Sequence, residues 1–363
     1  MLFQDRPIEK PEDLYDREVE YETLRKAVNS RAICVIVGAR RIGKTSLVKA
    51  TTHDLPRVYI DVRKFESFTY MSYNMFLEEL KKSLNDFISW DKRILKYLRR
   101  IRSLRIHEVE VEFSLGKERP SFSSILEALE DWAEDEGKRI VMIIDEAQEF
   151  IRMKGYNILP IIAYAYDNLK HISFVFAGSK IGLLYRFLRV NDPASPLYGR
   201  YIERIELTPL NREQSLEFLE IGFQEYHMRP DKDLLKEVID KLDGIIGWLS
   251  YLGLKAVKEG LSKEVIDKVL EDASRIAIQE FCNFVKVMNS KRYVEILKIL
   301  KEGATWGEIK RYLELRLGTR MYDSELSRLL KNLIDNGFIE KKDNMYMIID
   351  PILKYASEKI QCY

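Results

Sequence analysis

Short runs of apolar residues recur through the first 210 positions and predict buried strands. Residues 32–37, Ala-Ile-Cys-Val-Ile-Val, are apolar throughout and end at Gly38, as in a central parallel strand covered by helices on both faces. Between the runs, Tyr73–Phe87 and Ile125–Trp132 show helical spacing. Strands that alternate with helices predict an α/β fold with a mostly parallel sheet. The other strand-like runs are Arg57–Asp61, Ile140–Ile144, Ile172–Ala177 and Ile205–Leu207.

An insertion at about residues 91–119 interrupts this alternation. Its first half predicts a basic helix that contacts nucleic acid or a partner, or else a solvated amphipathic helix that buries Leu95, Leu98 and Ile101. We favour the solvated helix, because long basic side chains often cover apolar surface and the glutamates of residues 108–112 would neutralise them. The alternation over residues 108–115 predicts a half-buried strand. Only Asp91 opposes the basic residues Lys92, Arg93, Lys96, Arg99, Arg100, Arg102 and Arg105.

The pattern changes after residue 210 and predicts two further units. A capping signal at Asn211–Gln214 opens a helical stretch that continues to about Val287. The last unit predicts three helices and a hairpin that turns at Asp343-Asn344. We therefore expect domains at residues 1–210, 211–287 and 288–363. The expected elements of the last unit are helices at Tyr293–Lys301 and Asp323–Asn336, a helix opened by the capping box Thr305–Glu308, and the hairpin Phe338–Ile348.

Composition excludes several classes of protein. Of the 363 residues, 46% are hydrophobic and 32% charged, and the apolar runs are too short to cross a membrane. The 59 basic and 58 acidic residues nearly cancel, so contact with nucleic acid would depend on local basic surface. The N-terminus does not resemble a signal peptide. Cys34, Cys282 and Cys362 are odd in number and far apart, which predicts no disulfide and a reducing, cytoplasmic setting.

The strongest chemical signal follows the first strand, where the sequence fits the phosphate-binding loop G-x-x-x-x-G-K-[ST]. Its glycines let successive backbone N–H groups turn inward, and the following helix directs its positive end at a phosphate. Lys44 would bridge the β- and γ-phosphates of ATP, and the Thr45 hydroxyl would bind Mg²⁺. The alternative, a plain turn between strand and helix, explains less of the pattern. The residues are Gly38, Ala39, Arg40, Arg41, Ile42, Gly43, Lys44, Thr45 and Ser46.

A second signal supports the first. The apolar run Val141–Ile144 ends in two adjacent acids, Asp145 and Glu146. Asp145 is positioned to hold the Mg²⁺ shell, and Glu146 to act as the general base for an attacking water. An acidic pair that caps a helix is the alternative. Together with the upstream loop, the pair predicts an ATP-hydrolysing site with ADP as product.

These motifs resemble the AAA+ superfamily, and more narrowly the archaeal Walker-type ATPases related to the signal-transduction NTPases with numerous domains. The resemblance implies a P-loop NTPase core of three layers, with a strand inserted between the nucleotide strand and the Asp-Glu strand. It also implies a helical lid and a C-terminal winged helix. The residues that carry it are Asp16-Arg17-Glu18, the loop at 38–46, Ile-Ile-Asp-Glu-Ala-Gln-Glu at 143–149, Ala-Gly-Ser-Lys at 177–180 and Leu-Tyr-Gly-Arg at 197–200.

The resemblance suggests roles for three further residues. Ser179 falls where the family senses the γ-phosphate, and its alternative is an ordinary turn serine. Arg200 falls where the family carries an arginine finger, and its alternative is a surface ion pair. Arg17 would clamp the adenine, or else form an ion pair at a helix start. Relatives tend to have Gly-Gly-x-Pro-Gly-Trp-Leu in the lid, whereas this chain has Asp-Gly-Ile-Ile-Gly-Trp-Leu at 243–249.

The last unit offers a candidate DNA-binding face. If the helix at Asp323–Asn336 buries its leucines, polar side chains suited to base edges and phosphates are left toward solvent, and two lysines lie in the wing. Protein docking and intramolecular packing are the alternatives for this winged helix. The candidate DNA contacts are Arg328, Lys331, Asn332, Lys341 and Lys342.

Two functions from different classes follow. The first is an ATP-binding and ATP-hydrolysing switch that couples nucleotide state to the winged helix, with DNA, another protein or a second copy as partner and no membrane. The second is a DNA-binding regulator or interaction module in which the nucleotide is structural. The Asp145–Glu146 pair favours the first, because a pure binder needs no general base.

Overall fold

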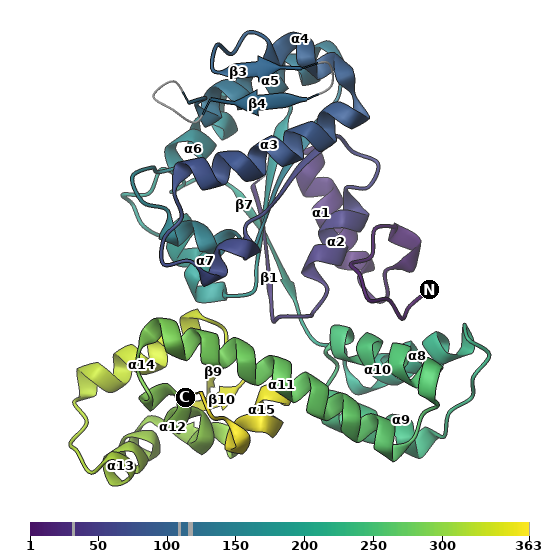
Figure 1. The fold of residues 1–363 in the computed structure, drawn as a ribbon, viewed down its shortest axis with the longest axis vertical. Helices are drawn as coiled ribbons and strands as arrows, with labels where there is room; N and C mark the ends of the chain where they lie inside the picture. Colours follow the sequence, from purple (N-terminus) through teal and green to yellow (C-terminus); the bar gives the residue numbers. More distant parts are fainter. Residues whose placement is uncertain (31–32, 108–109, 115–118, 363) are drawn as a thin grey trace.

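A five-stranded parallel sheet forms the centre of the N-terminal part in a computed structural model, which describes residues 1–30, 33–107, 110–114 and 119–362 (Figure 1). The strand order is β2–β5–β6–β1–β7, so β6 lies between the nucleotide strand β1 and the Asp-Glu strand β5, as the resemblance implies. Every residue of β1, β5 and β6 is buried, which explains their unbroken apolar runs. The strands are β1 (Ile33–Gly38), β2 (Arg57–Asp61), β5 (Ile140–Asp145), β6 (Ile172–Gly178) and β7 (Ile202–Leu207).

Helices cover both faces of this sheet and confirm the three-layer α/β fold. Successive residues of β1 alternate between the two cores: Cys34 and Ile36 pack with one set of helices, and Ile33 and Val35 with the other. The first face carries α1 (Glu18–Asn29) and α2 (Lys44–Thr51). The opposite face carries α3 (Tyr73–Trp90), α5 (Phe122–Asp135), α6 (Leu159–Asn168) and α7 (Ile181–Leu188).

The insertion differs from its prediction. Its helix is short, because the chain turns after α4 (Leu95–Leu98) and forms a two-stranded antiparallel hairpin of β3 (Leu104–Ile106) and β4 (Val111–Phe113). A single basic helix over residues 91–106 is therefore wrong. Arg93 pairs with Asp91, and Arg93, Lys96 and Arg100 also pair with acids of α5 and its C-terminal end, namely Glu136, Asp135 and Asp131. Of the predicted strand, residues 108, 109 and 115 lie outside the described residues.

A helical region follows the sheet. Asn211 caps α8 (Arg212–Gln224), with reciprocal bonds between Asn211 and Gln214 at 2.7 and 2.9 Å, as the sequence predicts. Its longest helix, α11, ends at Met288, one residue after the predicted boundary at 287, and its last turns pack against the C-terminal unit (Figure 1). The predicted domain boundaries stay predictions. The other helices are α9 (Lys232–Leu242), α10 (Ile246–Glu259) and α11 (Lys263–Met288).

The C-terminal unit contains the expected three helices and hairpin. Thr305 and Glu308 form the predicted capping box of α13. Asp343 and Asn344 both adopt positive φ, 48° and 69°, which matches a two-residue hairpin turn. The third strand of this sheet is β8 (Ala304–Thr305), in the order β8–β10–β9. The remaining elements are α12 (Arg292–Ile299), α13 (Trp306–Leu317), α14 (Asp323–Asp335), β9 (Ile339–Lys342), β10 (Met345–Ile348) and α15 (Pro351–Ala356).

In the part of the chain that the structure describes, no helix combines the length and apolar character needed to cross a bilayer. Short 3-10 turns complete the described structure. The turn η2 follows β2, and the turn η4 follows the Asp-Glu strand. The turns are η1 (Pro11–Asp13), η2 (Arg63–Ser67), η3 (Lys92–Ile94), η4 (Ala147–Arg152), η5 (Leu300–Glu302) and η6 (Ser357–Lys359).

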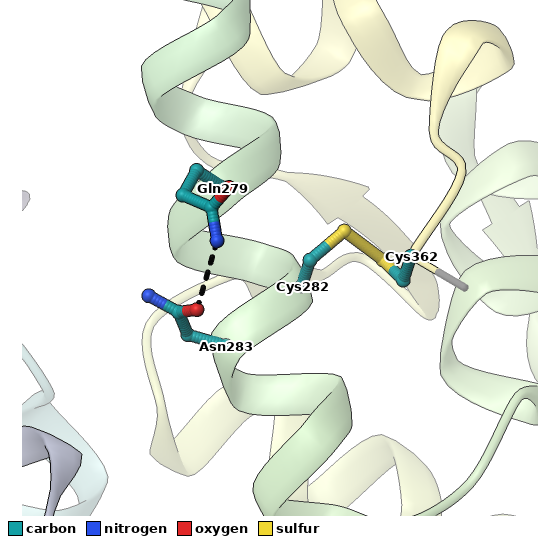
Figure 2. The surroundings of a disulfide bond; sticks show 4 residues. All are labelled: Gln279, Cys282, Asn283 and Cys362. Atoms are coloured by element: carbon teal, nitrogen blue, oxygen red, sulfur yellow. Dashed lines mark hydrogen bonds between the residues drawn. A yellow bond between two sulfur atoms is a disulfide. The ribbon is translucent and has the colours of Figure 1, made fainter.

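The cysteines also differ from their prediction. Cys282 of α11 and Cys362 near the C-terminus form a disulfide (Figure 2), with Cα atoms 5.0 Å apart. They are separated by 80 positions in the sequence, but α15 packs against α11 and returns the chain end to that helix. Spacing along the chain does not reveal this proximity. Cys34 is a buried free thiol, and the cysteine pattern therefore gives no argument for a reducing compartment.

Candidate nucleotide-binding site

A cavity of about 620 Å³ lies where β1 ends, among the loop after β1, residues 2–8 of the N-terminal segment and the start of α10. The backbone of the loop explains its two glycines. A Cβ at Gly38 would lie 2.7 Å from the Leu207 carbonyl oxygen, and Gly43 has a φ of +100° at the start of α2. Arg41 also adopts a left-handed φ of 63°. The loop therefore has the compact turn that the phosphate-binding pattern predicts.

Lys44 is buried at the base of this loop. Its Nζ donates to the carbonyl oxygens of Gly38 and Ala39 at 2.9 and 2.8 Å. Burial lowers the pKa of Lys44, while the charges of Glu146 and Asp145 oppose that effect. The ammonium is thus held at the loop beside the two acids that the sequence predicts to work with it.

Thr45 and Asp145, the two predicted Mg²⁺ ligands, lie in direct contact. The Thr45 hydroxyl donates to Asp145 Oδ2 at 2.7 Å, and Asp145 is only 1% exposed. Tyr59 of β2 donates its hydroxyl to the same oxygen at 2.6 Å. A hydroxyl beside a buried carboxylate is a hard-oxygen donor set that fits Mg²⁺, which retains most of its other ligands as water or phosphate oxygen.

Glu146 is the centre of a second cluster. Its Oε2 accepts hydrogen bonds from Ser179 Oγ at 2.7 Å and from Gln148 Nε2 at 2.5 Å. Burial raises the pKa of Glu146, but the Lys44 ammonium, these two hydrogen bonds and the Arg40 charge outweigh it and lower the pKa to about 2. The carboxylate is therefore ionised and held in place, with a φ of 54° at its backbone.

The structure brings most of the other predicted residues to the cavity. Ser46 lies at its edge, where its hydroxyl accepts the Ile8 N–H at 3.1 Å. Arg17 lines the cavity and is buried, donating to the carbonyl oxygens of Asp16 and Thr208. Arg200 does not line the cavity: its guanidinium pairs with Asp167 and donates to the Pro196 carbonyl. A finger role for Arg200 would thus require a second chain, and it stays a prediction.

The lid segment contacts the loop although it lacks the proline that the family resemblance implies. Ile246 stands at the position of that proline, as the first residue of α10. The Gly247 N–H donates to the Arg41 carbonyl at 2.9 Å, and the Arg41 guanidinium lies over the Trp248 ring at 4.3 Å from its centre. A Cβ at Gly247 would lie 2.8 Å from the Arg41 Cβ, so the glycine permits this close approach.

Sequence reasoning missed several residues of this site. Tyr59 follows the alternation of a strand and gives no separate signal, and Gln148 appears only within the family motif. The N-terminal segment was also missed as a wall of the cavity, although Phe3 anchors it against Phe218 and Phe223 of α8. Glu280 of α11 lines the cavity as well, and no local motif marks it.

The winged helix presents four of its five predicted contacts. Arg328 and Lys331 on α14 and Lys341 and Lys342 on β9 are exposed. Asn332 is half-buried and donates to the Tyr293 hydroxyl at 2.8 Å, so its predicted orientation toward solvent is wrong. The reason is that Tyr293 of α12 lies opposite Asn332 and accepts its amide N–H. The leucines predicted inside, Leu326, Leu329, Leu330 and Leu333, are buried.

Known proteins resemble this chain over nearly its whole length. A family model described as an ATPase domain predominantly from Archaea matches residues 14–252, and the MCM protein C-terminal winged helix-turn-helix domain matches residues 287–349. The structure of a Walker-type ATPase of Pyrococcus abyssi superposes with a TM-score of 0.86 at 29% identity, covering 99% of this chain and 100% of that one. The ORC2 protein of Aeropyrum pernix, in ADPNP–ADP complexes, superposes with a TM-score of 0.62 at 17% identity, covering 99% and 96%.

A curated relative is longer than this chain. An uncharacterized protein of Methanocaldococcus jannaschii is 26% identical over 333 residues, which are 90% of this chain and 62% of that protein. The chain thus spans less than two thirds of this relative. The archaeal ATPase model, however, matches more than half of the chain and includes the loop, the Asp-Glu strand and the start of the lid. The chain belongs to the family of ATPase domains found predominantly in Archaea.

Proposed function

We propose that the protein binds ATP with Mg²⁺, hydrolyses it to ADP and phosphate, and uses the nucleotide state to reposition its winged helix. One observation carries the proposal: Thr45 and Asp145 meet at 2.7 Å at the base of the phosphate loop, beside an ionised Glu146. The ADPNP–ADP complexes of the structurally similar ORC2 protein support nucleotide binding by this fold.

Each residue then has a defined task. The loop N–H groups and the α2 N-terminus bind the phosphates, and Lys44 exchanges the carbonyls of Gly38 and Ala39 for phosphate oxygens. Thr45 and Asp145 would hold Mg²⁺, which neutralises charge on the β- and γ-phosphates when bound. Glu146 accepts a proton from water as that water attacks the γ-phosphorus and the bond to the ADP oxygen breaks.

The pKa of Glu146 suggests how activity is controlled. A carboxylate with a pKa of about 2 is a weak base, and the charge of Lys44 and the bonds from Ser179 and Gln148 keep it so. Engagement of Lys44 and Ser179 by a γ-phosphate would remove these stabilising contacts and raise the basicity of Glu146. Ser179 therefore both holds the base and senses the phosphate in this proposal.

The winged helix is close enough to respond. Asp335 at the end of α14 pairs with Arg186 of α7. A Cβ at Gly337 would lie 2.9 Å from the Ser179 carbonyl oxygen, so the turn after α14 packs directly on the sensor segment. A shift of Ser179 on phosphate binding would consequently reach the winged helix without an intermediate.

Phosphate release tests the enzymatic part. We expect Glu146→Gln to bind ATP as tightly as the wild type but to turn over at least about 100-fold more slowly, since the base is lost and the loop is intact. Lys44→Ala should lose ATP binding itself. Hydrolysis by Glu146→Gln at the wild-type rate would refute the assignment of the base.

A second candidate function rests on the exposed basic side chains Arg328, Lys331, Lys341 and Lys342. In this alternative the protein is a DNA-binding regulator, and the nucleotide only stabilises the fold. It predicts negligible phosphate release by the wild type, with DNA binding that does not depend on ATP. The two candidates are thus separated by the same assay run with and without duplex DNA.

A further inference from the structure

The phosphate loop carries two arginine side chains that reach across to α11. Arg40 Nη1 lies 3.2 Å from Glu280 Oε2, and Arg41 pairs with the other oxygen of the same carboxylate. Glu280 is separated from these arginines by about 240 positions in the sequence. In Figure 1 the loop after β1 lies on the side of the core that faces α11. One carboxylate of the long helix thus holds both arginines of the loop.

Arg41 is fixed to the lid by further contacts. Its carbonyl accepts the Gly247 N–H, its guanidinium lies over Trp248, and Gly247 leaves no space between the two segments. These contacts do not include Glu280, so they would persist even if Arg41 lost its ion pair with that carboxylate. Arg41 therefore has a structural role, because it links the loop to the lid.

Arg40 has different surroundings. Its two ion-pair partners are carboxylates, Glu280 and Glu66 of η2, and it lines the cavity together with Lys44, Thr45 and Glu146. Burial lowers the pKa of Arg40, but the charges of Glu280, Glu66 and Glu146 raise it well above its usual range. Arg40 therefore shares this cavity with residues that are proposed to bind and hydrolyse ATP.

Glu66 has another cation and does not depend on Arg40. Lys180, which is buried next to Ser179, donates to Glu66 at 2.9 Å and to Glu149 at 2.8 Å. If the Arg40 guanidinium moved away, Glu66 would stay paired with Lys180 and Glu280 would stay paired with Arg41. Both carboxylates can therefore release Arg40 without leaving an uncompensated charge.

We propose that the Arg40 side chain binds the γ-phosphate of ATP from within the same chain, and that Glu280 is the carboxylate from which the phosphate takes it. This inference rests on the proposed binding of ATP at this site. A guanidinium exchanges a carboxylate for a phosphate readily, because both present two oxygens to its paired N–H groups. ADP lacks the competing anion, so Arg40 discriminates ATP from ADP.

The exchange also gives α11 a direct signal. With ATP bound, Glu280 would keep its ion pair with Arg41 and lose the one with Arg40, so one of the two ion pairs between the loop and α11 would be broken. The same helix carries Cys282, two positions further on, whose disulfide holds the C-terminal segment, and it packs against α15 (Figure 2). The winged helix is thereby attached to the helix that senses the loop.

Nucleotide affinity tests this inference without turnover. Affinities for ADP and for the non-hydrolysable analogue ADPNP, each with Mg²⁺, are measured by calorimetry on the full chain. We expect Arg40→Ala to weaken ADPNP about 10- to 100-fold, the effect of losing a charge-assisted bidentate contact, and to change ADP less than about threefold. Glu280→Gln should tighten ADPNP relative to ADP, since the competing carboxylate is neutralised.

Glu271→Gln is the matched control, because this exposed glutamate lies on the same helix about 13 Å from Glu280 along the helix axis and does not line the cavity. It should leave both affinities unchanged. Equal weakening of ADP and ADPNP by Arg40→Ala would make Arg40 purely structural and overturn the inference. Unchanged ADPNP affinity in Glu280→Gln would remove Glu280 as the competitor and overturn it as well. Failure of the wild type to bind either nucleotide would instead refute the proposed function and this inference with it.

Discussion

Reduction of the Cys282–Cys362 disulfide should destabilise the winged helix by an amount that the fold allows to be calculated. The bond closes a loop of about 80 residues that contains every element from α12 to the last turn. In the chain-entropy model, a loop of this length restricts the unfolded chain by about 15 cal/mol/K, which is about 4.5 kcal/mol at 25 °C. If the free energy of unfolding falls by about 2 kcal/mol per molar urea, the urea concentration at the unfolding midpoint of this unit would fall by about 2 M.

Hydrogen exchange of peptides from α12 to α14 in a urea series, with and without reductant, measures this shift. The double variant Cys282→Ser, Cys362→Ser should match the reduced wild type and should not respond to reductant. Peptides of the β1–β7 sheet serve as an internal control, because they lie outside the loop. Equal midpoints for the oxidised and reduced wild type would show that the disulfide does not stabilise this unit. A reductant effect that persists in the double variant would show that the shift has another cause.

Three further predictions follow from the site and the winged helix. Because the pKa of Glu146 is about 2 against an ordinary 4.5, its ionisation stabilises the nucleotide-free fold above pH 4.5, and this stabilisation is lost as the pH falls toward 2. The stability of Glu146→Gln, measured by circular dichroism in an acid titration, should therefore decline less steeply over this pH range than that of the wild type. Identical curves would contradict this prediction. Gly247→Ala should weaken ADP binding about tenfold in calorimetry, since its Cβ would meet Arg41 at 2.8 Å; unchanged affinity would mean that the lid contact is dispensable. Duplex DNA binding should fall steeply with salt, and Lys341→Glu with Lys342→Glu should flatten that slope; absence of binding at about 50 mM salt would leave the winged helix as a protein-docking domain.

Local motifs predicted most elements of the fold. The P-loop, the Asp-Glu strand and the capping residues Asn211 and Thr305 all depend on neighbours within a few positions, so the sequence displays them directly. The apolar runs predicted the three central strands β1, β5 and β6 most clearly, because strands buried on both faces are almost entirely apolar. The edge strand β7 is half-exposed and contains charged residues, so only its last three residues, Ile205–Leu207, were predicted.

Contacts between distant segments could not be predicted in the same way. Cys362 meets Cys282, and Glu280 meets Arg40, only because α15 and α11 fold back on the core. Asn332 was expected to face solvent from its helical position, but helix periodicity cannot reveal that the Tyr293 hydroxyl is opposite it. The prediction for the basic insertion could not include its partners for a related reason, since three of the acids that pair with it lie on α5 or at its C-terminal end. For example, Asp131 pairs with Arg100 across 31 positions in the sequence.

Hydrogen exchange of the turn after α14 tests most directly whether nucleotide state reaches the winged helix. Glu146→Gln with Mg²⁺ and either ATP or ADP would hold the two states long enough for the comparison, and Lys44→Ala serves as the control that cannot respond to ATP. We expect ATP to alter exchange at Asp335–Phe338 and in α11 around Glu280, relative to ADP, whereas the α5 amides stay unchanged. Identical exchange at these positions in the ATP and ADP states would contradict this expectation.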